Sequence, residues 1–170
     1  RTQDIEIAGL FAAIFAWGKR KSILNSCDRL LHGMDNAPYD FIMNFGERDL
    51  ATFLSFAHRT FNATDLYHFF EVLKHHYRHL RNPSLETAFS QWMMPGDKTV
   101  ENALNGFHHY FFSKAITEDY PERTIKHIAA PFKKSACKRL NMYLRWMVRR
   151  DNKGVDFGIW KSISPAQLVC

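Results

Sequence analysis

Apolar residues recur every three to four positions along almost the whole chain, which is the spacing of one face of an α-helix. No stretch of useful length alternates between apolar and polar residues as a half-buried strand would. The pattern therefore predicts an all-α fold, a compact multi-helix domain. In the segment Asp4–Trp17 apolar side chains cover nearly the whole circumference, which predicts a buried central helix.

Turn residues and caps divide the rest of the chain into further predicted helices. Gly33 ends the second helix, Thr64 and Asp65 are suited to cap a longer one, and Pro83 suits a first helical position. The predicted elements are Ser22–Gly33, Tyr39–Asn44, Arg48–His58, Thr64–Arg81 with Leu80 on its buried face, a short helix from Pro83, Lys98–Lys114, a short segment between Pro121 and Pro131, Ser135–Arg150 and a helix start at Ser164.

Composition narrows the class of protein. The chain has 170 residues, of which 46% are hydrophobic, and this predicts one domain, residues 1–170. Cys27, Cys137 and Cys170 are far apart in sequence, which argues against a disulfide framework and favours a reducing, cytoplasmic location. The longest apolar run, Ile7–Trp17, is shorter than the roughly 18 residues of a membrane span. We therefore expect neither secretion nor a membrane partner.

Positive charge is concentrated near the end of the chain. The net charge is +6, and residues Pro131–Lys153 carry eight basic side chains against Asp151 alone, a net of +7. The other residues therefore sum to −1. Such segregation of charge is typical of a surface that binds phosphates. The alternative is that these residues form an ordinary solvated helix face.

The predicted helix Ser135–Arg150 separates its apolar and polar sides clearly. An apolar stripe suited to packing on the core consists of Leu140, Tyr143, Leu144, Met147 and Val148. The opposite side carries hydrogen-bond donors at intervals of three and four, namely Lys138, Asn141, Arg145 and Arg149. Donors in such a line can follow a phosphate backbone, and we expect that backbone to be DNA.

Lys138 is the candidate reactive group on this helix. With Ser135 as N-cap, Lys138 would be the third helical residue, near the positive end of the helix dipole. That position and the neighbouring Arg139 and Arg145 disfavour an ammonium ion, and a neutral amine is a nucleophile. The alternative is an ordinary solvated or phosphate-contacting lysine.

Three stretches carry a resemblance that covers essentially the whole chain: Ala16–Ile23, His58–Leu66 and Ser135–Leu168. They resemble an uncharacterised bacterial family that is distantly related to the helix-hairpin-helix DNA glycosylases, such as endonuclease III. In those enzymes a GxGxK hairpin enters a helix, its backbone amides hold a phosphate, and the lysine attacks C1′ of a flipped nucleotide.

The resemblance assigns roles to individual residues. Lys134–Lys138 matches the hairpin and Lys138 the nucleophile, with Lys134 and Ala136 in place of the glycines. A register guided by archaeal oxidised-guanine glycosylases would instead put Asn141 at the lysine position. Together with the basic helix, the resemblance implies a set of DNA contacts: Lys134, Ser135, Arg139, Asn141, Arg145 and Arg149. It also implies a pocket for the flipped base at Trp17 and Arg20.

The glycosylases also use an aspartate that follows the lysine. In relatives the segment after Leu168 continues into a proline, an apolar residue and an aspartate, so we expect that residue beyond Cys170. The chain is then a fragment of a longer protein and catalytically incomplete by itself.

Other side chains are weaker candidates. His68, Glu71, His75 and His79 share a helix face but spread over three turns, so solvated histidines are favoured over metal ligands. We expect no metal and no small-molecule cofactor. The leading hypothesis is a DNA-binding protein of the glycosylase superfamily, with a damaged-base glycosylase and lyase as its catalytic form. The alternatives are a non-catalytic nucleic-acid-binding module and a helical protein-interaction scaffold.

Overall fold

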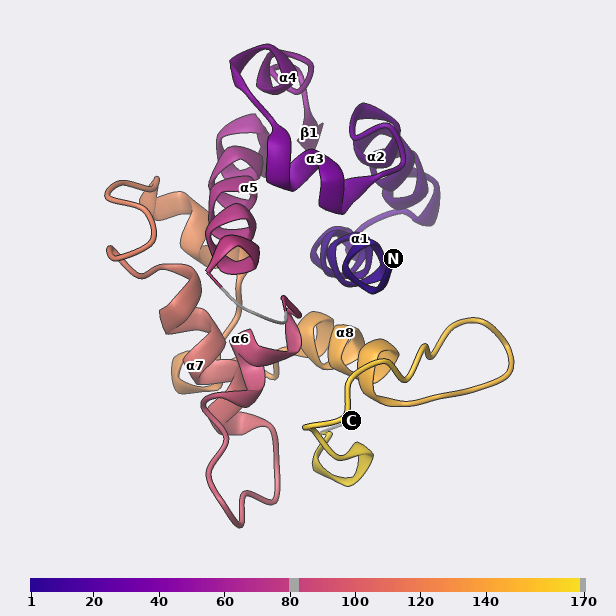
Figure 1. Cartoon of the computed structure of the whole chain (residues 1–170), viewed down its shortest axis with the longest axis vertical. Helices are drawn as coiled ribbons and strands as arrows, with labels where there is room; N and C mark the ends of the chain where they lie inside the picture. Colours follow the sequence, from indigo (N-terminus) through magenta and orange to yellow (C-terminus); the bar gives the residue numbers. More distant parts are fainter. Residues whose placement is uncertain (80–82, 169–170) are drawn as a thin grey trace.

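The computed structural model describes residues 1–79 and 83–168, and these form a mainly helical fold (Figure 1). The α-helices are α1 Thr2–Phe15, α2 Arg20–Gly33, α3 Pro38–Asn44, α4 Glu47–Ala51, α5 Ala63–Arg78, α6 Glu86–Ser90, α7 Glu101–Phe111 and α8 Lys138–Val148. Shorter 3-10 helices are η1 Glu122–His127, η2 Pro131–Lys133 and η3 Pro165–Gln167. The mostly helical character predicted from the apolar spacing is confirmed.

Helix α1 lies at the centre of the molecule. In Figure 1 it runs between a group formed by α2 to α5 and a second group formed by α6 to α8, and it packs on α2, α3 and α8. Ile7, Leu10 and Phe15 are fully buried on it, so the predicted central helix is confirmed. It ends at Phe15 instead of Trp17, because the chain turns at Gly18, whose φ of 99° lies in the left-handed region.

A small hairpin replaces the second half of one predicted helix. Helix α4 stops at Ala51, and strands β1 Ala57–His58 and β2 Phe61–Asn62 pair antiparallel. The prediction of a helix over Arg48–His58 is therefore wrong beyond α4. Arg59 has a φ of 56°, a turn conformation that a helix excludes.

The ends of the other helices shift by a few residues. Asn62, with Asp65, caps α5, so the caps predicted at Thr64 and Asp65 stand just inside the helix. Helix α5 ends at Arg78, and the predicted continuation through Leu80 and Arg81 lies outside the described residues. Helix α6 begins after the predicted start at Pro83, and α7 is shorter than Lys98–Lys114.

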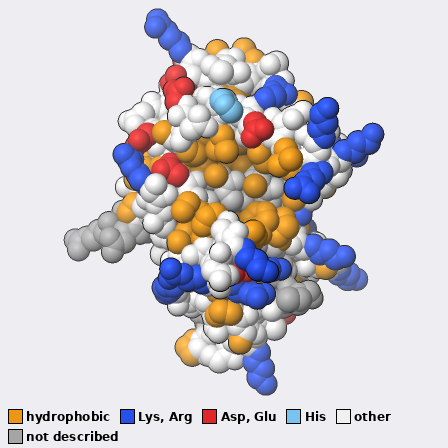
Figure 2. Space-filling view, turned by 90° about the vertical axis from the view of Figure 1, so that its right-hand side faces the viewer, with side chains coloured by type: hydrophobic (Ala, Val, Ile, Leu, Met, Phe, Trp, Pro, Cys, Tyr) orange, Lys and Arg blue, Asp and Glu red, His pale blue; other side chains and the backbone are white. Residues whose placement is uncertain are grey.

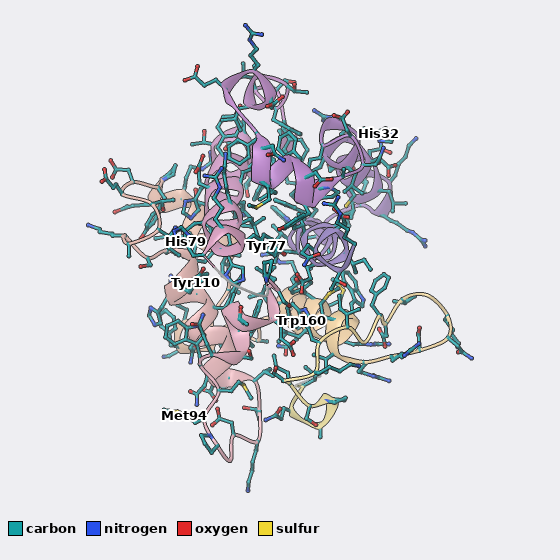
Figure 3. The ribbon with its side chains drawn as sticks, viewed as in Figure 1. His32, Tyr77, His79, Met94, Tyr110 and Trp160 are labelled. Carbon is teal, nitrogen blue, oxygen red and sulfur yellow. The ribbon has the colours of Figure 1, made fainter. Side chains whose placement is uncertain are left out.

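A buried carboxylate ties distant segments together. Glu6 on α1 is fully buried and accepts hydrogen bonds from Tyr77 Oη at 3.0 Å, Trp160 Nε1 at 2.7 Å and the Leu85 amide at 3.0 Å. Figure 3 labels Tyr77 and Trp160 near the centre of the molecule. Because a buried charge needs such partners, Glu6 fixes α1, α5 and the segments before α6 and after α8 relative to one another.

A helix that crosses a bilayer needs about 20 mostly apolar residues. None of the helices within residues 1–79 and 83–168 is both long and apolar enough to cross a membrane.

Candidate functional site

A tight turn connects η2 to α8. Lys134 has a φ of 58° and Cys137 a φ of 49°, both in the left-handed region that non-glycine residues seldom adopt. The Lys134 amide donates to Pro131 O at 2.7 Å, and the Cys137 amide donates to Ser135 Oγ at 3.2 Å. Lys134 thus adopts the conformation expected of a hairpin glycine, whereas Ala136 does not.

Helix α8 begins later than predicted. Its N-cap is Cys137, and its first hydrogen bond runs from the Asn141 amide to Cys137 O at 2.9 Å. The prediction of Ser135 as N-cap is wrong, and Lys138 is the first helical residue instead of the third. The amides of Lys138 and the two residues after it precede the first intrahelical bond, which makes this end suited to an anion.

Two pockets flank the start of α8, and Lys138 lines both. One, of about 430 Å³, is lined by Ala136, Lys138, Asn141, Met142, Arg145, Arg149, Pro165 and Leu168. The other, of about 240 Å³, is lined by Ile14, His127, Ala129, Ser135, Ala136, Cys137, Lys138, Arg139 and Leu140. The structure therefore brings Lys138, Asn141, Arg145 and Arg149 to one pocket, as the helical spacing predicts.

Asn141 closes the turn. Its side-chain Nδ2 donates to Ala136 O and Cys137 O, each at 3.3 Å. Its Oδ1 is buried and has no hydrogen-bond partner among the described residues. Since the side-chain NH2 group donates to the turn, Asn141 stabilises the turn that precedes Lys138. Asn141 is therefore not a free donor for a phosphate.

Asp156 pairs with both arginines of the exposed face. Its Oδ2 lies 3.2 Å from Arg145 Nε and 3.8 Å from Arg149 Nε. The Asp156 side chain is 2% exposed, whereas the two arginine side chains are about half exposed. One negative charge therefore offsets part of the charge of two guanidinium groups, and the charge count over Pro131–Lys153 did not include it.

Arg139 is directed toward the interior. Its Nη1 donates to Ile14 O at 2.6 Å, near the end of α1, where carbonyl groups lack partners within the helix. Burial lowers the pKa of its guanidinium from the usual value. Arg139 thus joins α8 to α1, and the structure does not place it with Arg145 and Arg149 as a surface contact.

The residues of the predicted base pocket do not line the two pockets described above. The Trp17 ring packs against the Arg59 guanidinium, 4.7 Å from the ring centroid, and meets His58 edge to face. Arg20 is the exposed first residue of α2. Neither Trp17 nor Arg20 lines a pocket that Lys138 lines.

The smaller pocket contains a histidine that the sequence did not single out. His127 is 3% exposed, and its Nε2 lies 3.4 Å from Oδ2 of the fully buried Asp65. Desolvation lowers the pKa of His127 to about 4, against a smaller opposing effect of Asp65. His127 is therefore neutral near pH 7.

A larger, apolar groove lies on another face. It has a volume of about 530 Å³ and is formed by α1, α2, the C-terminal part of α8 and the loop around residues 154–157. Figure 2 shows a band of hydrophobic side chains on this side of the molecule, with basic and acidic side chains along its edges. Its lining comes from segments far apart in sequence, which is why helical periodicity alone did not reveal it.

The histidines of α5 have separate surroundings. His68 is buried, with Nε2 at 3.1 Å from Phe111 O, whereas His75 and His79 stack on each other at the surface; Figure 3 labels His79. Within residues 1–79 and 83–168, no group of three or more His, Cys, Asp or Glu side chains is arranged to hold a metal ion.

Comparison with known proteins gives a family without a described activity. No curated protein and no solved structure matches the chain. One family model matches residues 1–170, and its description is "Protein of unknown function (DUF2400)". The chain therefore belongs to the DUF2400 family.

Proposed function

We propose that the chain binds DNA through residues 134–138 and the exposed side of α8. The observation that carries this proposal is the pocket at the start of α8, which gathers Lys138, Arg145 and Arg149 beside backbone amides that lack helical partners. Positive side chains and helix N-terminal amides are the groups that most often contact phosphate oxygens.

The surrounding sequence favours an anionic partner. No Asp or Glu occurs between Arg123 and Arg150. The carboxylate that contacts the exposed side of α8 belongs to Asp156, in the loop after the helix. Lys134, Ser135 and Lys138 are exposed and accessible to a ligand. A phosphate chain would therefore meet positive potential along the turn and the first turns of α8.

The salt dependence of binding tests this proposal. Each phosphate that a lysine neutralises contributes about 0.9 to the slope of log affinity against log salt. Replacing both Lys134→Gln and Lys138→Gln should flatten the slope for a labelled duplex by about two units, while Arg48→Gln on the distant, exposed α4 should leave it unchanged. Equal slopes for all three proteins would refute this surface.

A second candidate function adds chemistry at Lys138. Its position between two pockets at the start of α8 favours a role as the amine that attacks C1′ of a damaged nucleotide, as the resemblance to the glycosylases implies. The amine would replace the base at C1′, and the base would leave with a proton. Breaking of the C1′–O4′ bond, with the amine's proton passing to O4′, would then give an imine, which borohydride reduces to a stable amine.

Trapping tests this candidate separately from binding. The full-length protein would be incubated with borohydride and duplexes that carry oxidised guanine or oxidised thymine. We expect a covalent adduct that Lys138→Gln abolishes. Salt-dependent binding without an adduct would reject the lyase and leave a non-catalytic binding module.

A further inference from the structure

Phe132 exposes an aromatic ring next to the proposed DNA-binding turn. It lies on η2, and 49% of its surface is accessible to solvent. The neighbouring aromatic residues Phe107, Phe111 and Phe112 are buried. About half of the Phe132 surface is therefore accessible to a partner.

Contacts with residues of α7 hold the Phe132 ring in place. The Phe132 amide donates to Asn105 Oδ1 at 3.0 Å, and Pro131 restricts the backbone before it. The ring stacks on His109, with centroids 5.0 Å apart and an interplanar angle of 9°, and His108 meets it edge to face at 5.2 Å. A ligand that contacts this ring would therefore lose little of its binding free energy to ordering the side chain.

The charge beside the ring is positive. Lys133 Nζ lies over the Phe132 ring, 5.7 Å from its centroid, and Lys134 follows in the left-handed turn. Both lysines are exposed, and the segment from Arg123 to Arg150 contains no acidic residue. An aromatic ring flanked by lysines fits a partner that has flat rings and negative charges in alternation.

We propose that Phe132 stacks on an unpaired nucleobase while Lys133 and Lys134 contact the adjoining phosphates. This inference rests on the proposed DNA binding and adds that the surface prefers single-stranded or locally opened DNA. Every base has a π-face, so stacking tolerates any sequence, and in a paired duplex these faces are occupied by neighbouring bases. An acidic peptide without aromatic residues would pair with the lysines but would offer the ring no flat surface to stack on.

A fluorescent adenine analogue in an oligonucleotide tests the proposal. Binding would be measured for the single strand and for its blunt duplex with wild-type protein, Phe132→Ala, Phe132→Leu and Phe132→Trp. Phe157→Leu serves as the matched control, because Phe157 is also exposed, at 43%, but lies beyond the other end of α8. Far-ultraviolet circular dichroism confirms that each variant is folded.

We expect the wild-type protein to quench the analogue in the single strand, because stacking on an aromatic ring quenches it. Phe132→Ala should weaken single-strand binding at least about fivefold and change duplex binding less than about twofold, since base stacking contributes about 1–3 kcal/mol. Phe132→Leu should lose the quenching, and Phe132→Trp should keep it.

The possible failures are distinguishable. If the wild-type protein binds neither form of DNA, both the proposed function and this inference are overturned. If it binds with the expected salt dependence but Phe132→Ala and Phe132→Leu match it in affinity and quenching, only the stacking role is rejected. The same holds if Phe157→Leu weakens single-strand binding as much as Phe132→Leu.

Discussion

The carboxylate of Asp156 lies 3.2 Å from Nε of Arg145 and is almost fully buried beneath the exposed face of α8. The same oxygen reaches Arg149, so one acidic side chain from the loop after α8 orients both arginines. An acid in this position limits the net charge of the face and restricts where the two guanidinium groups can move.

Asp156→Asn should therefore strengthen DNA binding. Releasing the arginines adds about one effective charge, so the slope of log affinity against log salt should steepen by about one unit. Fluorescence anisotropy with a labelled duplex measures this, with the exposed Asp119→Asn as the control. An unchanged slope would mean that Arg145 and Arg149 do not contact phosphates.

Glu6→Gln should destabilise the fold by about 2–4 kcal/mol, because an amide puts a donor among groups that all donate to the carboxylate. Urea unfolding followed by circular dichroism gives the free energy of unfolding. Glu47→Gln on the exposed start of α4 is the matched control and should change it little. Equal unfolding free energies for the two variants would contradict the role assigned to Glu6.

Acidification should destabilise the protein through His127. Burial lowers the pKa of His127 from 6.5 to about 4 in the folded state, so between these values the unfolded chain binds the extra proton. The stability associated with neutral His127 is complete above pH 6.5 and decreases as the pH falls toward 4, by up to about 1.4 kcal/mol per pH unit.

Urea unfolding of wild-type protein and His127→Gln across this pH range tests the assignment. Burial also lowers the pKa of His68 and His76, so the variant should have a shallower dependence on pH but not a flat one. A variant that is as sensitive to acid as the wild type would exclude His127 as a contributor.

The left-handed conformation of Lys134 predicts an order of stability between two variants. Both Lys134→Gly and Lys134→Ala remove the charge, but only glycine adopts a φ of 58° without steric cost. The glycine variant should be more stable than the alanine variant by about 1 kcal/mol. Thermal unfolding compares them directly, and a more stable alanine variant would show that the turn has another geometry.

Apolar spacing predicted most helices because their buried faces repeat at the helical period, as α1 and α8 illustrate. It failed where backbone dihedrals change within a few residues. The hairpin at Ala57–Asn62 depends on the left-handed Arg59, and the late start of α8 depends on left-handed Lys134 and Cys137. Neither feature has the glycine that usually indicates such a turn in a sequence.

The candidate site was predicted only in part for a similar reason. Periodicity placed Lys138, Asn141, Arg145 and Arg149 on one side of a helix, and all of them line one pocket. Periodicity could not show that Arg139 donates to Ile14 O or that Asp156 pairs with Arg145, because these contacts join segments that are apart in sequence. A side chain's partner across the fold has no local signature in the sequence.

Amide chemical shifts of isotopically labelled protein during titration with a short duplex test DNA binding at this surface most directly. We expect the largest changes at residues 133–140, where the turn and the first amides of α8 would meet phosphates. These chemical-shift changes should become smaller as salt is added, because salt weakens phosphate contacts. An absence of changes, or changes concentrated on α3 and α4 instead, would contradict the assignment of this surface.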